Sequence, residues 1–146
     1  MSAEVLIASY LRIANEDLAG ARQLAGTGNR NAMYLCSQAA EKIIRAVLTS
    51  EGKNAGIKHQ LDELVDMIPD ENPLKPGLRV IQDLTDYATS YRYPSPKGRI
   101  KTPPSREAFE RDASAVQAAL EGAAERFGVD LGKPDAPARN AGPIRS

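Results

Sequence analysis

Residues 31–51 read Asn-Ala-Met-Tyr-Leu-Cys-Ser-Gln-Ala-Ala-Glu-Lys-Ile-Ile-Arg-Ala-Val-Leu-Thr-Ser-Glu, and this stretch determines the fold that the sequence predicts. Two apolar rows run along it at helical spacing, Leu35-Ala39-Ile43-Ala46 and Cys36-Ala40-Ile44-Val47. Because adjacent rows make a wide apolar face, we expect this helix at the centre of a bundle. The remaining narrow face is polar, and it is a solvated or hydrogen-bonded surface or the floor of a ligand groove. Its members are Gln38, Glu41, Lys42 and Arg45.

Four other segments also have helical periodicity, and no part of the chain has convincing strand alternation. The five predicted helices cover about residues 7–25, 31–51, 61–68, 78–91 and 105–127, of which the third is short. A glycine or proline follows each one and marks its end. Four longer helices, one short helix and short connections predict an all-α protein, an antiparallel up-and-down helical bundle.

The length of 146 residues is typical of a single domain. We expect residues 1–128 to form the bundle and residues 129–146 to be a disordered C-terminal tail, because the tail is rich in proline and glycine and has little to bury. Cys36 is the single cysteine and is expected to be a buried apolar residue rather than a reactive thiol. No apolar run is long enough for a membrane span and no signal-peptide pattern is present, which favours a cytoplasmic protein without a membrane partner.

Lysine and arginine together number 19, as do aspartate and glutamate, so any attraction to an anionic partner must be local. Residues 92–106 meet this condition, because they contain no acidic residue and five basic ones, Arg92, Lys97, Arg99, Lys101 and Arg106. Four prolines stiffen the segment and keep it from forming a helix. The segment is either a phosphate-binding surface or a solvated connector whose charges only maintain solubility.

Four short motifs follow one another along the chain: Asp17-Leu18, Gln38-Ala39-Ala40-Glu41-Lys42, Lys58-His59-Gln60-Leu61 and Tyr91-Arg92-Tyr93-Pro94. Their order and spacing resemble a HEPN domain, the helical nucleotide-binding module of higher eukaryotes and prokaryotes, over about Tyr10 to Phe127. The resemblance implies a helical bundle, often a homodimer with a cleft at its interface. It also implies that the partners are nucleotides, RNA or a nucleotidyltransferase. No cofactor is expected.

Many members of that family are metal-independent ribonuclease toxins, whose signature is an arginine followed after four to six residues by a histidine. Arg92 matches the arginine by its local pattern, but no histidine follows it, and His59 is the only histidine of the chain. Since histidine is the common proton-transfer group near neutral pH, the chain keeps the binding half of the signature and lacks the other half. His59 is interpreted as a structural hydrogen bonder in a loop or as a displaced base near Arg92.

The candidate ligand-binding residues are Arg92, Tyr93, Lys97, Arg99 and Lys42. Arginine offers a planar fork that suits phosphate, although Arg92 at a helix end can instead bond the last backbone carbonyls. Tyr93 lies just outside the helix and can contact a base, whereas Tyr91 belongs to an apolar row and is expected in the core. The acidic cluster between Asp62 and Glu71 lacks the spacing of a metal-binding loop, so no metal site is predicted.

The favoured hypothesis is a dimeric, non-catalytic HEPN-like module that binds a nucleotide or RNA phosphate. It would act beside a nucleotidyltransferase in a toxin–antitoxin or regulatory pair. A second hypothesis is a metal-independent endoribonuclease toxin that uses Arg92 with another base, such as His59 or a tyrosine. A third is a protein-interaction scaffold, in which the alanine-rich stripes of the first and fifth helices pack on a partner.

Overall fold

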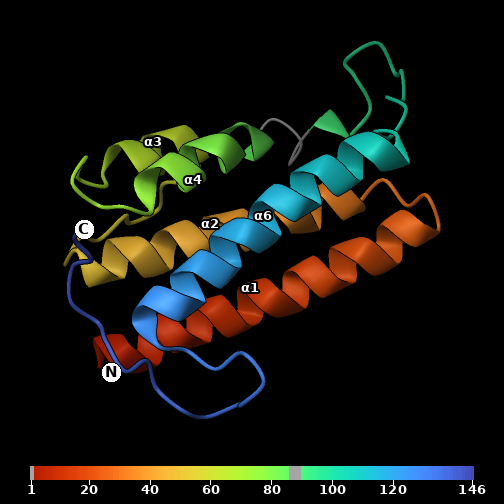
Figure 1. Ribbon diagram of the computed structural model, residues 1–146. Helices are drawn as coiled ribbons and strands as arrows, with labels where there is room; N and C mark the ends of the chain where they lie inside the picture. Colours follow the sequence, from red (N-terminus) through yellow and green to blue (C-terminus); the bar gives the residue numbers. More distant parts are fainter. Residues whose placement is uncertain (1, 86–89) are drawn as a thin grey trace.

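The structure, a computed structural model, describes residues 2–85 and 90–146 as helices joined by turns and loops (Figure 1). The predicted all-α fold is confirmed, and the described residues contain no strand. None of the helices within these residues has the length and apolar character needed to cross a membrane. The elements are α1 (Ala3–Gly26), α2 (Ala32–Ser50), α3 (Leu61–Asp66), α4 (Lys75–Ile81), the 3₁₀ helix η1 (Gln82–Leu84) and α6 (Arg106–Phe127).

Helix α2 lies at the centre of the bundle, as its two apolar rows predict. It packs against α1, α6, α3, α4 and η1, and Figure 1 shows it between the long helices and the pair formed by α3 and α4. All members of the two rows are fully buried except Leu35, which is half-buried. Burial of each isoleucine or valine contributes about 1.5–3 kcal/mol, so this one helix supplies a large part of the core.

Helix α6 begins and ends where the sequence predicts. The Ser105 hydroxyl accepts a hydrogen bond from the Ala108 amide at 3.1 Å, an N-cap that stabilises the helix by about 1 kcal/mol. Gly128 ends the helix with a φ of 63°, a left-handed conformation that favours glycine. A Cβ at Gly128 would also lie only 2.8 Å from the Cβ of Arg139. Glycine therefore lets the later part of the chain pack closely against the end of α6.

The fourth predicted helix, residues 78–91, differs from the structure in its start and in its pitch. Helix α4 begins at Lys75, because Pro76 has the fixed φ that suits a first helical turn. After seven residues the α-helical geometry gives way to η1. The apolar side chains buried in α4 and η1 are spaced by three, and the three residues per turn of the 3₁₀ helix continue this spacing from Ile81 to Leu84. These side chains are Leu78, Ile81 and Leu84.

This change of pitch alters the predicted apolar row of the fourth helix. Val80 was expected to share a buried row with Leu84, and this prediction is wrong, since Val80 is 69% exposed while Leu84 is buried. Tyr91, at the end of the same row, is buried as expected. Tyr87 and Ala88, which also belong to the predicted row, lie outside the described residues.

Cys36 is fully buried in α2, which confirms its predicted packing role. Burial first, and then the nearby Asp112 carboxylate, raises the pKa of the Cys36 thiol to about 12. Because the thiolate is the reactive form of cysteine, this side chain acts as a small apolar residue and not as a nucleophile.

Residues 129–146 pack against the bundle, whereas the sequence predicted a disordered tail. The apolar side chains of Val129, Ala138 and Ile144 are buried. The Ala138 amide donates a hydrogen bond to the Glu4 carbonyl at 3.0 Å, which ties the tail to the start of α1. The sequence misleads here because three apolar residues spaced so far apart have no periodicity that marks them as buried.

An ion pair fastens the end of this tail to the end of α2. The Arg145 guanidinium donates to both oxygens of the Glu51 carboxylate, at 2.7 and 3.0 Å, and the Asn72 amide nitrogen donates to it at 2.9 Å. The Glu51 side chain is only 4% exposed. The hydrogen bond from Arg145 lowers the pKa of the Glu51 carboxyl below its ordinary value of 4.5. Folding is therefore favoured by ionisation of Glu51.

We expect Arg145→Ala to lower the free energy of unfolding at pH 7, because the buried Glu51 carboxylate loses its cationic partner. The stabilisation is fully present above pH 4.5 and is lost as the pH falls through the lower pKa of folded Glu51. Urea unfolding followed by circular dichroism at pH 7 and pH 3 measures this. In a Glu51→Gln background the same substitution should have little effect at either pH, and a pH-independent loss would contradict the prediction.

Candidate functional site

Arg92 and His59 line one cavity, of about 390 Å³, although α3, α4 and η1 lie between them in the sequence. Helix α2 contributes Tyr34, Gln38 and Glu41 to its wall. The fold therefore brings the arginine of the family signature and the only histidine of the chain to the same cavity, called here the Arg92 cavity. Gln38 and Glu41, two members of the polar face of α2 (called here the polar stripe), line this cavity.

The Arg92 guanidinium is held by stacking on aromatic rings. Its central carbon lies 4.0 Å from the centre of the Tyr34 ring and 5.4 Å from that of the Tyr93 ring. Such a cation–π contact is worth about 0.5–1 kcal/mol at an exposed site. Within residues 2–85 and 90–146 the guanidinium bonds no backbone carbonyl, so it does not cap a helix there. A guanidinium that stacks through its face keeps the N–H donors at its edge for an anion.

His59 is oriented by a carboxylate. Its Nδ1 lies 3.2 Å from each oxygen of Glu41, whose side chain is only 12% exposed. The His59 side chain itself is 74% exposed. When Nδ1–H donates to Glu41, the other ring nitrogen, Nε2, has the lone pair that can accept a proton. The pair has the arrangement of a histidine held in one tautomer by an acidic residue.

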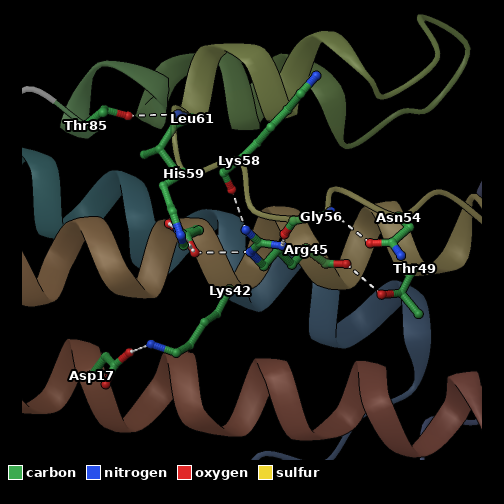
Figure 2. Close-up of polar contacts among 11 residues, drawn as sticks. Asp17, Lys42, Arg45, Thr49, Asn54, Gly56, Lys58, His59, Leu61 and Thr85 are labelled. Carbon is green, nitrogen blue, oxygen red and sulfur yellow. Dashed lines mark hydrogen bonds and ion pairs between the residues drawn. The ribbon is translucent and has the colours of Figure 1, made fainter. Parts of the chain in front are cut away.

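Arg45 holds both Glu41 and the loop that carries His59 (Figure 2). Its Nε donates to Glu41 Oε2 at 3.1 Å, and its Nη2 donates to the Lys58 carbonyl next to His59. At the other end of this loop, the Leu61 amide donates to the Thr85 hydroxyl at 2.8 Å. These contacts fix the backbone of the loop at both ends. The backbone of His59 is therefore held in place without contacts from its exposed side chain.

Lys42 was predicted to bind the ligand, but it lies apart from the Arg92 cavity. Its Nζ is 2.5 Å from Asp17 Oδ2 on α1, and both side chains are largely buried, at 24% and 19% exposed. Figure 2 shows Lys42 extending from α2 toward α1, on the side away from His59. Lys42 therefore joins α1 to α2 in this structure. Helical spacing places Lys42 beside Glu41, but it does not reveal that Asp17 stands opposite.

Tyr93 and Arg99 lie in a second depression of about 570 Å³, which we call the Tyr93 hollow. It is also lined by Ser90, Pro94, Ser95, Ile100 and Lys101. Lys97 is exposed in the turn between Ser95 and Arg99. No carboxylate in the described part of the chain pairs with the cations of this loop. The predicted basic segment is therefore positive in the structure as well.

The family model of the HEPN domain matches residues 7–125, which is most of the chain. The chain belongs to the HEPN family. HEPN domains form a nucleotide-binding and ribonuclease-type superfamily, so the resemblance carried by the short motifs is confirmed. In this HEPN domain the histidine at the Arg92 cavity comes from the loop before α3. Comparison with curated proteins and with solved structures gives no match.

Sequence reasoning missed Tyr34, the ring on which Arg92 stacks. A signal was present, because Tyr34, Gln38, Glu41 and Arg45 follow one another at spacings of four, three and four. The polar stripe of α2 therefore extends one turn toward its N-terminus. The pairing of Glu41 with His59 was also missed, since it joins two segments whose relative position only the fold determines.

We expect Arg45→Ala to lower the free energy of unfolding by about 2–3 kcal/mol, because the partly buried Glu41 loses its cation. Amides of residues 56–59 should also exchange hydrogen faster. Urea unfolding and native-state hydrogen exchange measure the two effects. The matched control is Arg79→Ala, which removes an exposed ion pair with Asp66 and should cost less than about 1 kcal/mol. Equal losses in both variants would show that Arg45 has no special role.

Proposed function

We propose that this HEPN domain binds a phosphate group of a nucleotide or of RNA at Arg92. The observation that carries the proposal is the Arg92 guanidinium, which stacks on Tyr34 while its edge donors have no protein partner among the described residues. An arginine in this arrangement offers two parallel N–H groups that match two phosphate oxygens. The family supports the same class of ligand, since its members are nucleotide-binding or ribonuclease-type proteins.

Neighbouring cations favour RNA over an uncharged ligand. Lys97, Arg99 and Lys101 follow Arg92 in a segment without acidic residues. The chain as a whole is neutral, so the attraction acts close to this segment and is screened by salt beyond about 10 Å. A strand that contacts several of these cations releases counterions, and its affinity must then fall as the salt concentration rises.

We expect unpaired RNA to bind with a slope of log K against log salt of about −2, which corresponds to about three phosphate contacts. Arg92→Ala should weaken binding roughly tenfold or more and reduce the slope by about 0.7. Fluorescence anisotropy at several salt concentrations measures both quantities. The control is Lys133→Ala, an exposed lysine in the segment after α6, which lies at the other end of the bundle (Figure 1). Salt-independent binding of RNA by the wild type, or no binding, would exclude RNA as the ligand.

A second function, metal-independent RNA cleavage, is favoured by the Glu41–His59 pair at the Arg92 cavity. In this mechanism His59 Nε2 takes the proton of a ribose 2′-hydroxyl, whose oxygen attacks the adjacent phosphorus. The bond from phosphorus to the 5′-oxygen breaks, and the protonated histidine returns a proton to that oxygen. Arg92 stabilises the extra negative charge on the phosphate oxygens. The products are a 2′,3′-cyclic phosphate and a 5′-hydroxyl.

If the domain cleaves RNA, we expect His59→Ala to lower the cleavage rate by about a hundredfold or more while RNA binding persists. Glu41→Gln should also slow cleavage, because an amide no longer holds the histidine as a carboxylate does. Labelled RNA incubated with EDTA and resolved on gels measures the rate, and a substrate with one 2′-deoxy nucleotide should resist cleavage at that position. RNA that is shifted but left intact by the wild type would make the domain a binding module.

The oligomeric state and the protein partner stay predictions that come from the family. We propose a homodimer that acts with a nucleotidyltransferase in a toxin–antitoxin or regulatory pair. The exposed basic segment supports a nucleic-acid ligand for a monomer as well as for a dimer, since the segment is accessible in the single chain. Co-purification of the domain with a nucleotidyltransferase tests the pairing, and light scattering tests the dimer.

A further inference from the structure

We propose that the Tyr93 hollow binds a nucleobase of single-stranded RNA whose neighbouring phosphate is held at Arg92. This inference rests on the proposed function and adds the class of substrate. The ligand is an unpaired strand, rather than a free mononucleotide or a duplex, and Tyr93 provides the surface on which one of its bases stacks.

The walls of the hollow have the character that a base requires. Tyr93 and Ile100 are 61% and 70% exposed, and both line the hollow together with Pro94. Large apolar side chains are usually removed from water, so two of them on one hollow indicate a surface for a flat, partly apolar ligand. The volume of about 570 Å³ lies within the usual range of small-ligand sites and has room for a base with its sugar.

The charge around these walls is positive. Arg99 and Lys101 also line the hollow, and the Lys101 ammonium lies 4.8 Å from the centre of the Tyr91 ring. Among the described residues that line the hollow, none is acidic. An apolar floor beside cations fits a nucleotide, because a nucleotide combines a flat base with a negatively charged phosphate. Aromatic rings and cations arranged in this way are the usual surface for unpaired nucleic acid.

The hollow and the Arg92 cavity are adjacent. Arg92 and Tyr93 are consecutive residues, and the guanidinium of the first lies 5.4 Å from the ring of the second. A strand whose phosphate bonds Arg92 therefore has a neighbouring base within reach of Tyr93. In a duplex the bases are stacked on one another and cannot stack on a protein ring, which is why the ligand must be unpaired.

The loop that forms the hollow is held in shape without regular secondary structure. The Ser95 amide donates to the Arg99 carbonyl at 2.8 Å, and the Arg99 amide donates to the Ser95 hydroxyl at 3.1 Å. Gly98 has a φ of 81°, which completes this tight turn. Arg30 donates to the Lys101 carbonyl at 3.0 Å and ties the loop to the start of α2. A loop fixed in this way loses little entropy when a ligand binds.

Fluorescence anisotropy with a short unpaired RNA, a blunt RNA duplex and a competing nucleoside monophosphate tests the inference. We expect the unpaired RNA to bind at least tenfold more tightly than the other two. Tyr93→Ala should weaken binding of the unpaired RNA by about tenfold, the effect of losing one stacked base. The affinity for the monophosphate should hardly change, because Tyr34 remains the nearer ring on Arg92.

Further controls separate stacking from charge and from loss of folding. Tyr93→Phe keeps the ring and should recover most of the affinity that Tyr93→Ala loses, whereas Val80→Ala removes an exposed apolar side chain on α4 and should have no effect. An abasic strand of equal length and charge should bind the wild type only as well as normal RNA binds Tyr93→Ala. Thermal unfolding by circular dichroism checks that each variant is folded.

The outcomes distinguish this inference from the proposed function. Equal binding of the monophosphate, the duplex and the unpaired strand, or unchanged binding by Tyr93→Ala, would overturn the base site and leave phosphate binding at Arg92 intact. If the wild type binds none of the three ligands, both the base site and the proposed function are wrong.

Discussion

Helix α2 is enclosed by other elements except along its polar stripe. Every charged side chain of the stripe must therefore pair with another group or reach water. Lys42 finds Asp17 on α1, and Arg45 finds Glu41 and the loop before α3. The polar stripe therefore joins α2 to α1 on one side and to the loop before α3 on the other. Burial of the apolar rows fixes the helix in place, and in doing so it fixes the positions of the polar groups as well.

The same arrangement positions the side chains of the candidate site. Arg45 holds the Glu41 carboxylate, and Glu41 in turn orients the exposed ring of His59. One turn earlier on the same helix, Tyr34 provides the ring on which Arg92 stacks. Two side chains that lie far apart in the sequence thus meet at one cavity because both are positioned by α2. A site built on a packed helix is more precise than one built on loops alone.

The charge of the molecule is distributed so that attraction to an anion is local. With equal numbers of acidic and basic residues, the chain has no net field to draw nucleic acid from a distance. Elsewhere many cations are neutralised, as Lys75 is by Asp70 and Arg145 is by Glu51. The segment from Arg92 to Arg106 is different, since no acidic residue lies within it. Anion binding would therefore be confined to this part of the surface and would weaken as the salt concentration rises.

The sequence by itself determined the all-α fold, the central place of α2 and both ends of α6. These features depend on periodicity and on residues such as Ser105 and Gly128, which act on their immediate neighbours. Only the tertiary structure decided that the chain after Gly128 packs on the bundle, that Lys42 pairs with Asp17, and that His59 meets Glu41 beside Arg92. Those contacts join segments far apart in the chain, and local spacing cannot specify them because they exist only after the core has brought the helices together.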